Sequence, residues 1–177
     1  REHVREMQST TFEAANRPDF SDKKVFFTLH EPPRPNITDS LIYDPGKYRY
    51  VRFNSSVDHR ANYAEIEFYG KQTEESQEER LTGKIIGYPP IHSDNPSPYI
   101  RAMDGNLETW FEKRTRTEGW VGLDLGRGNE RIITRVRFCP RSDTNFILEG
   151  DTYELFYWDE EQWNSAGSQV AVTGMLT

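Results

Sequence analysis

Oxygen-bearing side chains gather in one short stretch of the sequence. Residues 104–109 place a carboxylate at Asp104, an amide at Asn106 and a hydroxyl at Thr109 around Gly105, which permits a tight turn. Hard cations such as Ca²⁺ take six to eight oxygen ligands, backbone carbonyls included, and a curled loop can supply them. The stretch therefore predicts either a structural calcium loop or a hydrogen-bonded turn that needs no metal, and the residues alone leave both open.

Other kinds of chemistry find little support. The net charge is −7 and no dense run of Lys and Arg occurs, which argues against nucleic acid and anionic membranes as partners. The four histidines show no motif that links them to the single cysteine, Cys139, which we expect to be a buried structural thiol. Glu65 and Glu67 lie two apart on a predicted strand, but we expect such a pair to be a solvated face. The sequence thus predicts that the chain is not an enzyme.

The pattern of apolar residues predicts an all-β chain. Aromatic residues make up 13% of the sequence, which suits short strands joined by tight turns. No segment has the length or caps of a sizeable helix, and no apolar run approaches the 18 residues of a membrane span. Strands are predicted at Lys24–Thr28, Tyr48–Phe53, Ala64–Tyr69, Gly119–Leu125, Ile132–Cys139, Thr152–Trp158 and Gln169–Thr173.

A polar, mostly acidic segment at residues 71–80 separates two β-rich halves and predicts a solvated boundary. Four apolar residues before it match four after it at a constant offset of about 126 residues. The matches are Phe12, Phe20, Phe27 and Leu29 with Phe138, Phe146, Tyr153 and Leu155. We therefore expect residues 1–72 to be the C-terminal part of one module, 73–80 a linker, and 81–177 the N-terminal part of a second. Either flanking sequence is missing, or strands from Lys24–Tyr69 complete the sandwich that begins at Leu81.

Two groups of segments resemble one family. Ala102–Trp110, Gly119–Gly126 and Ile133–Phe138 resemble the front half of discoidin domains, also called coagulation-factor type C domains, and of the related family 32 carbohydrate-binding modules. Tyr48–Phe53 and Ala64–Gly70 resemble the closing strands of the same family. The closing strands come first in this chain, which reverses the family's order and agrees with the two-module interpretation. Residues 140–146 and 150–158 are similar to tandem modules in secreted proteins of Bacteroidetes.

The resemblance implies a jelly-roll β-sandwich (the galactose-binding-domain-like fold) with ligands bound by loops at one end. It implies structural calcium held by the carbonyls of Ala102 and Asn106, by Asp104 and Thr109, and by Glu65 from the closing strand. Candidate glycan-binding residues in the loops are His92, Asn95, Tyr99, Arg114, Arg116, Arg141 and Asn145. Each of these loops could equally be an ordinary solvated turn. Trp110 and Trp120 are expected to pack in the core, and Trp163 to be more exposed than Trp158.

These observations favour a non-catalytic carbohydrate-binding or adhesion module. We expect it to belong to a secreted or cell-surface bacterial protein and to bind a glycan or glycoprotein surface, with neighbouring domains in a longer chain. The alternative is a structural spacer that positions a catalytic domain absent from this chain, such as a glycoside hydrolase or a transglutaminase-like domain. Because one fold can bind many different ligands, the choice between these two functions has to be argued from the residues of the site.

Overall fold

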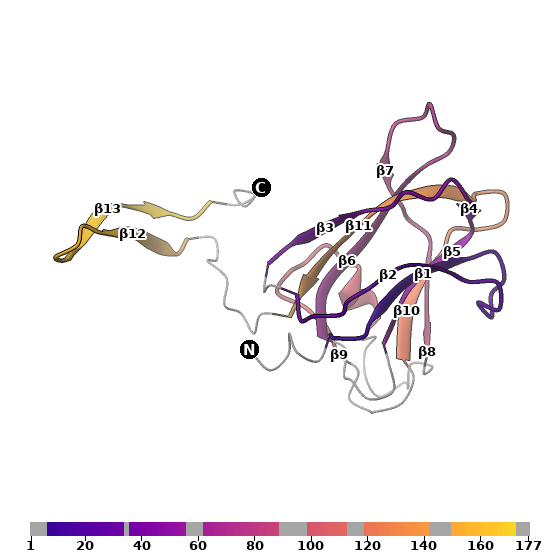
Figure 1. Ribbon diagram of the computed structural model, residues 1–177, viewed down its shortest axis with the longest axis horizontal. Helices are drawn as coiled ribbons and strands as arrows, with labels where there is room; N and C mark the ends of the chain where they lie inside the picture. The colour runs from indigo at the N-terminus through magenta and orange to yellow at the C-terminus, as the bar shows by residue number, and fades with distance from the viewer. Residues whose placement is uncertain are drawn as a thin grey trace. The chain divides into compact units, whose positions relative to one another are not determined.

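The computed structural model describes residues 7–33, 36–55, 62–88, 99–112, 119–141 and 150–172. The fold is all-β, as predicted: every strand pair is antiparallel, and the described residues contain no α-helix. The chain divides into two compact units, residues 1–142 and 143–177, which are described separately. The first unit is a β-sandwich (Figure 1).

One sheet of the sandwich has five strands in the order β2-β1-β5-β10-β8. They are β1 (Thr11–Ala15), β2 (Lys24–Thr28), β5 (Tyr50–Ser55), β8 (Lys84–Tyr88) and β10 (Gly119–Asp124). The other sheet has six strands built around the long pair β11 and β6. They are β3 (Thr38–Leu41), β4 (Lys47–Tyr48), β6 (Asn62–Lys71), β7 (Glu79–Arg80), β9 (Phe111–Glu112) and β11 (Arg131–Pro140). A short 3₁₀ helix, η1 (Ile100–Ala102), precedes β9.

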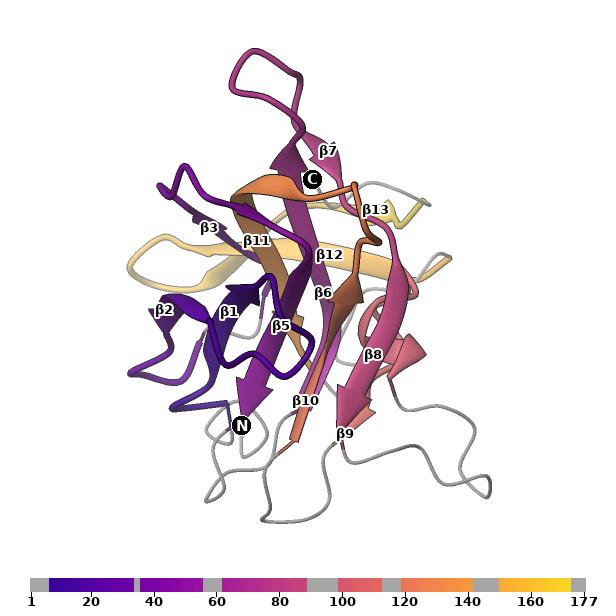
Figure 2. The same cartoon turned by 90° about the vertical axis from the view of Figure 1, so that its right-hand side faces the viewer.

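The two sheets lie face to face (Figure 2), and aromatic side chains fill the space between them. Phe12 of β1 stacks on Phe138 of β11 with ring centres 5.2 Å apart, and Phe53 of β5 lies 4.5 Å from Tyr63 of β6. All four rings are almost fully buried. Alternation along each strand directs these residues inward, so the period-2 pattern in the sequence does place the core.

Strands from both sides of residues 73–80 pair with one another. β5 pairs with β10, and β6 pairs with β11 over most of its length. Part of the predicted linker is itself a strand, because Glu79 and Arg80 form β7 against β6. The predicted boundary at 73–80 is therefore not the boundary between the compact units, which falls after Ser142. Of the two alternatives, the structure has the strands before residue 73 completing the sandwich begun at Leu81.

The predicted strand Tyr48–Phe53 is wrong in one respect. Tyr48 belongs to β4 and pairs with Arg131 in the six-stranded sheet, whereas Tyr50 begins β5 in the five-stranded sheet. The chain thus changes sheets at Arg49, whose guanidinium binds Asp124 through two hydrogen bonds of 2.7 and 2.8 Å. Alternation alone cannot reveal such a crossing, because both parts keep the same period.

The outer face of the five-stranded sheet carries a second small core. Arg52 of β5 binds Glu13 of β1: its Nε and Nη2 lie 2.8 and 2.7 Å from the same carboxylate oxygen, Oε2. Its guanidinium lies 3.8 Å from the ring centre of Phe20. Phe20 has a φ of 55°, a strained conformation for a residue with a side chain, and its burial over Arg52 offsets that cost. On the neighbouring β10, Gly122 leaves room for this pair, since a Cβ there would lie 2.0 Å from the carbonyl oxygen of Val51.

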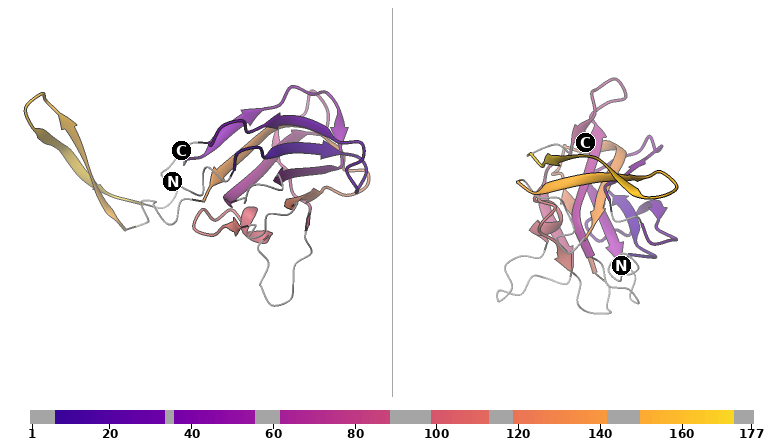
Figure 3. Two further views of the ribbon diagram at one scale, coloured as in Figure 1. Left: turned by 60° about the horizontal axis from the view of Figure 1, so that its bottom comes forward. Right: turned by 90° about the vertical axis from the view of Figure 1, so that its left-hand side faces the viewer.

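The second unit is a two-stranded hairpin of β12 (Thr152–Trp158) and β13 (Trp163–Val170), shown in Figure 3. β12 has the predicted bounds, but β13 begins six residues before the predicted Gln169–Thr173 strand. Its turn is held by Asp159, whose Oδ1 accepts hydrogen bonds from the backbone N–H groups of Glu161 and Gln162. Local residues therefore suffice to reverse the chain at this point.

Candidate functional site

The turn at residues 104–109 concentrates oxygen atoms around one hydroxyl. The Thr109 hydroxyl lies 2.7 Å from Asp104 Oδ2, 3.0 Å from the carbonyl oxygen of Asn106 and 3.5 Å from that of Arg101. Asp104 Oδ1 accepts a hydrogen bond of 2.9 Å from the Asn106 N–H. A single hydroxyl has one proton to donate, so it can satisfy one of its three oxygen neighbours at a time. The turn therefore has an excess of acceptors.

Glu65 of β6 closes this turn from the neighbouring sheet. Its Oε2 accepts a 2.9 Å hydrogen bond from the Gly105 N–H, and Gly105 has a φ of +77°, which favours glycine. Its Oε1 lies 3.1 Å from Arg80 Nη2, and Arg80 Nη1 lies 3.1 Å from a Glu67 oxygen. The expectation of a solvated carboxylate face is wrong for Glu65, which is buried.

The electrostatic environment of Glu65 disfavours its charge. Burial is the main cause, and it raises the pKa of the Glu65 carboxyl to about 7. The Gly105 N–H and Arg80 oppose this rise in pKa, while the carboxylates of Glu67 and Asp104 add to it. A cation beside the turn would relieve the repulsion and favour ionised Glu65.

The residues of the turn fit a hard divalent cation. Two carboxylates, a hydroxyl and backbone carbonyls are the donors that calcium prefers. Among the carbonyls, that of Arg101 faces Thr109, one residue before the expected Ala102, which is the last residue of η1. In the part of the chain that the structure describes, no group of three or more His, Cys, Asp or Glu is placed to hold a metal ion. Any cation here would depend on carbonyl and hydroxyl oxygens as much as on Asp104 and Glu65.

The strand ends at the lower end of the sandwich in Figure 2 flank the predicted binding loops. In the five-stranded sheet Gly119 is opposite Ser55, and Trp120 is opposite Tyr88. In the six-stranded sheet Asn62 is opposite Glu112. Five of the predicted ligand residues lie outside the described residues: His92, Asn95, Arg114, Arg116 and Asn145.

Arg141 is a predicted glycan-binding residue that does lie at this end of the sandwich. Its backbone N–H donates to the carbonyl oxygen of Asn62 at 3.1 Å, which fixes it beside the start of β6. Its guanidinium lies 4.1 Å from the ring centre of Trp110 and 3.4 Å from a Glu112 oxygen. The result is a stacked cation, an aromatic ring and a carboxylate side by side. Such a group offers both apolar and hydrogen-bonding contacts.

Tyr99 does not belong to the candidate site. It is buried, with its ring centre 5.6 Å from that of Phe111, and burial raises the pKa of its hydroxyl to about 12. Its ring also packs over Gly87, where an added Cβ would come within 2.8 Å of it. Tyr99 was predicted as a glycan-binding loop residue, but its ring packs in the core.

Cys139 and Trp120 agree with their predicted structural roles. Cys139 is buried, and burial raises the pKa of its thiol to about 11, so the thiol stays protonated at neutral pH. Trp120 packs against Phe20 with ring centres 5.5 Å apart. Both side chains contribute to packing in the sandwich.

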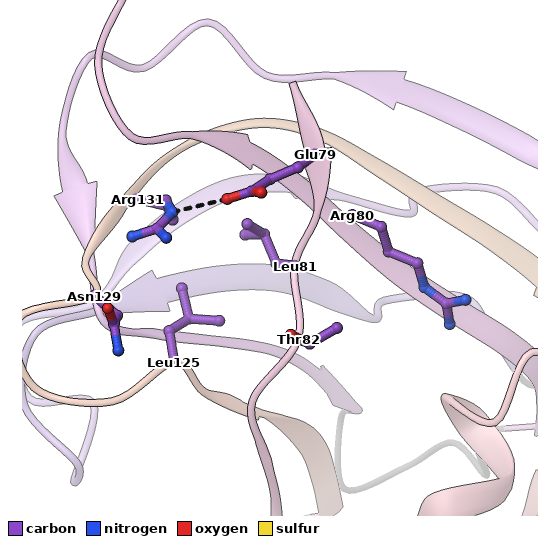
Figure 4. Close-up of a pocket in the computed structure, with 7 residues that line it drawn as sticks. All are labelled: Glu79, Arg80, Leu81, Thr82, Leu125, Asn129 and Arg131. Atoms are coloured by element: carbon purple, nitrogen blue, oxygen red, sulfur yellow. Dashed lines mark hydrogen bonds and ion pairs between the residues drawn. The ribbon is translucent and has the colours of Figure 1, made fainter. Parts of the chain in front are cut away.

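A hollow at the opposite end of the sandwich was not predicted. It has a volume of about 270 Å³ and lies near the end of β10 and the start of β11 (Figure 4). Its wall contains an ion pair in which Arg131 Nε lies 3.2 Å from Glu79. The lining residues are Glu79, Arg80, Leu81, Thr82, Leu125, Asn129 and Arg131. The hollow contains no residue of the turn at 104–109, although its Arg80 also contacts Glu65.

Comparisons with protein-family models, with curated proteins and with solved structures found no match to this chain. Among the described residues, no helix has the length and hydrophobicity needed to cross a bilayer. The function therefore has to be argued from the geometry of the site itself.

Proposed function

We propose that this chain is a non-catalytic carbohydrate-binding module of a secreted or cell-surface bacterial protein. In this proposal the sandwich binds a glycan with the loops at the end where β9 and β11 pair with the start of β6. The turn at 104–109 binds a structural calcium ion that orders the adjoining loops. The proposal applies to the sandwich, residues 1–142.

The contact between Glu65 and Gly105 carries the proposal. The family resemblance consists of opening and closing segments that occur in reversed order in the sequence. Glu65 comes from a closing strand and Gly105 from the opening turn, and their 2.9 Å hydrogen bond joins the two segments 40 residues apart. The resemblance implies that Glu65 and residues on both sides of Gly105 belong to one calcium site, and the contact between the two segments supports that arrangement.

The cluster around Arg141 supports sugar recognition over catalysis. A guanidinium offers a planar set of donors that matches neighbouring hydroxyl oxygens, and the Glu112 carboxylate accepts hydrogen bonds from hydroxyl protons. The Trp110 ring adds an apolar surface of the kind that C–H groups of a sugar contact. Glu65 and Glu67 both bind Arg80 and thus have a structural partner.

Glycan binding is tested by titrating the 177-residue chain with purified polysaccharides and with a glycan array. The Arg141→Ala variant should weaken binding at least tenfold, and Arg141→Lys should restore only part of it. Arg131→Ala is the matched control, since Arg131 lies at the opposite end and should leave binding unchanged. The proposal fails if a folded chain binds no glycan at millimolar concentration, or if both arginine variants bind equally well.

Calcium binding is tested separately by thermal unfolding with and without Ca²⁺. Calcium should raise the melting temperature of the sandwich, and Asp104→Asn or Thr109→Val should remove most of that rise. Asp19→Asn is the control, because Asp19 makes a similar turn contact with the Ser21 N–H in another loop. If Ca²⁺ has no effect on the unaltered chain, the turn is a metal-free hydrogen-bonded turn.

A further inference from the structure

The β12–β13 hairpin exposes large apolar side chains along its whole length. Leu155 and Trp163 are each 67% exposed, and most of the other large apolar residues of the hairpin are about half exposed. The full set is Tyr153, Leu155, Phe156, Tyr157, Trp158, Trp163, Val170 and Val172. Soluble proteins rarely leave this much contiguous apolar surface exposed unless it forms an interaction site.

Both faces of the hairpin carry these residues. Alternation along β12 places Tyr153, Leu155 and Tyr157 on one face. Phe156 and Trp158 lie on the other face, where Trp158 meets Trp163 with ring centres 5.5 Å apart. A two-stranded hairpin at the surface of a domain normally has one polar face. Apolar residues on both faces are typical of strands inside a larger sheet.

Both edges of the hairpin are also available for pairing. In the described residues β12 pairs with β13 and with no other strand, so each has an unused row of backbone donors and acceptors. A hairpin of this size is marginally stable in water unless further strands or a packed surface support it. The unpaired backbone groups and the exposed apolar side chains both indicate that an additional strand pairs with the hairpin.

The charge of this region defines what kind of strand fits. Residues 143–177 contain seven acidic residues and no Lys, Arg or His. The remaining 22 acidic residues of the chain are balanced by its 22 Lys and Arg, so the whole net charge of −7 resides in this region. A second copy of the hairpin would place like charges side by side, which is unfavourable between neighbouring strands.

We propose that the β12–β13 hairpin is a docking element for a basic, strand-forming segment of a partner polypeptide. The segment alternates apolar residues with Lys or Arg and adds to an edge of the hairpin. Its apolar residues extend the face that carries Tyr153, Leu155 and Tyr157, and its cations lie on the other face, near Glu154 and the acidic turn at 159–161. This inference concerns residues outside the proposed glycan site and does not rest on glycan binding.

The test uses the 177-residue chain and a ten-residue fluorescent peptide that alternates lysine with valine. A matched peptide has glutamate in place of each lysine, and a third has the same composition as the first in scrambled order. The lysine–valine peptide should bind, its affinity should fall as salt rises, and hydrogen exchange of backbone amides in β12 or β13 should slow at least tenfold. The glutamate and scrambled peptides should bind at least tenfold more weakly.

Variants assign the binding to the hairpin. Glu154→Lys and Leu155→Ser should each weaken peptide binding at least fivefold, and Glu154→Lys does so without removing an apolar residue. Tyr43→Ser is the control, because Tyr43 is an exposed aromatic of the sandwich, 89% exposed, and should not affect binding.

Other outcomes would overturn the proposal. One is equal binding of the lysine and glutamate peptides, and another is the absence of any binding at millimolar peptide. Self-association of the chain that Phe156→Ser abolishes would identify a second copy as the occupant. Polysaccharide binding that Trp163→Ala abolishes would make the hairpin a glycan-stacking surface.

Discussion

The β1–β2 and β12–β13 hairpins have opposite environments. Both carry aromatic residues on short antiparallel strands, and part of β12 matches part of β2 in the internal repeat. Phe12 and Phe27 stack with ring centres 4.7 Å apart, and β1 also pairs with β5 while Phe12 packs on the facing sheet. In the second hairpin Tyr153, which matches Phe27 in that repeat, is exposed, and so is Leu155. Burial of an aromatic strand thus depends on a third strand and a facing sheet, which the sandwich supplies to one hairpin alone.

The largest expected difference between the two regions is the effect of removing an aromatic ring. Phe12→Ala should lower the free energy of unfolding of the sandwich by about 3–5 kcal/mol, because it leaves a cavity among three rings. Trp163→Ala should lower it by less than about 1 kcal/mol, since an exposed ring leaves no cavity. Urea unfolding followed by circular dichroism measures both. Equal losses would mean that the hairpin is part of the same cooperative unit.

Neutralising an acidic residue should also cost more stability in the sandwich than in the β12–β13 hairpin. Burial by itself raises the pKa of Glu13, but hydrogen bonds from Thr11, Arg52 and Lys23 outweigh it and hold the pKa below its ordinary value. Glu13→Gln should therefore cost about 3 kcal/mol of unfolding free energy, because it leaves Arg52 buried without its counter-ion. Glu154→Gln in the hairpin should cost almost nothing. If adding Arg52→Met to Glu13→Gln recovers no stability, the loss does not come from the uncompensated arginine.

The pH dependence of stability tests the turn beside Glu65. The pKa of Glu65 is raised by folding, so the folded chain binds a proton between about pH 4.5 and 7 that the unfolded chain has lost. Stability should consequently fall as pH rises through this window, by at most roughly 3 kcal/mol. The Glu65→Gln variant, which cannot ionise, should lack that part of the decrease. Unfolding at pH 5 and pH 8 for both proteins gives the comparison, and identical pH profiles would contradict the assignment to Glu65.

The smallest effect is expected from removing the hairpin. A chain ending at Ser142 should keep the unfolding free energy of the sandwich within about 1 kcal/mol, because the two compact units have separate strands. Thermal unfolding of the shortened and complete chains measures the difference. A loss of several kcal/mol would show that residues 143–177 stabilise the sandwich directly.

Much of the fold followed from local patterns. Strands β2 and β12 have their predicted bounds, and β6, β10 and β11 differ by one or two residues at their ends. The crossing at Arg49 and the buried pair of Glu13 and Arg52 were missed, since they depend on partners far along the chain. Alternation along β5 does place Arg52 on the face away from Val51 and Phe53. It could not reveal that Phe20 covers that side.

For the candidate site too, the sequence predicted local features and missed contacts between distant residues. The oxygen-rich turn at Asp104–Thr109 was recognisable because its oxygen-bearing residues are neighbours in sequence. The resemblance also named Glu65, although the residues between the two gave no sign of their contact. Tyr99 was misassigned because a tyrosine that follows a proline-rich loop has the same local sequence whether its ring faces solvent or the core.

The sequence by itself determined strands β2, β6, β10, β11 and β12 to within two residues, the acidic C-terminal region and the turn around Asp104, because each depends on residues close together in the chain. The tertiary structure decided that strands on either side of residues 73–80 form one sandwich. It also decided that Glu65 is buried against Gly105, and that the apolar residues of β12 and β13 stay exposed. Strand partners and burial depend on which distant segments meet, and the period of a strand carries no information about its partner.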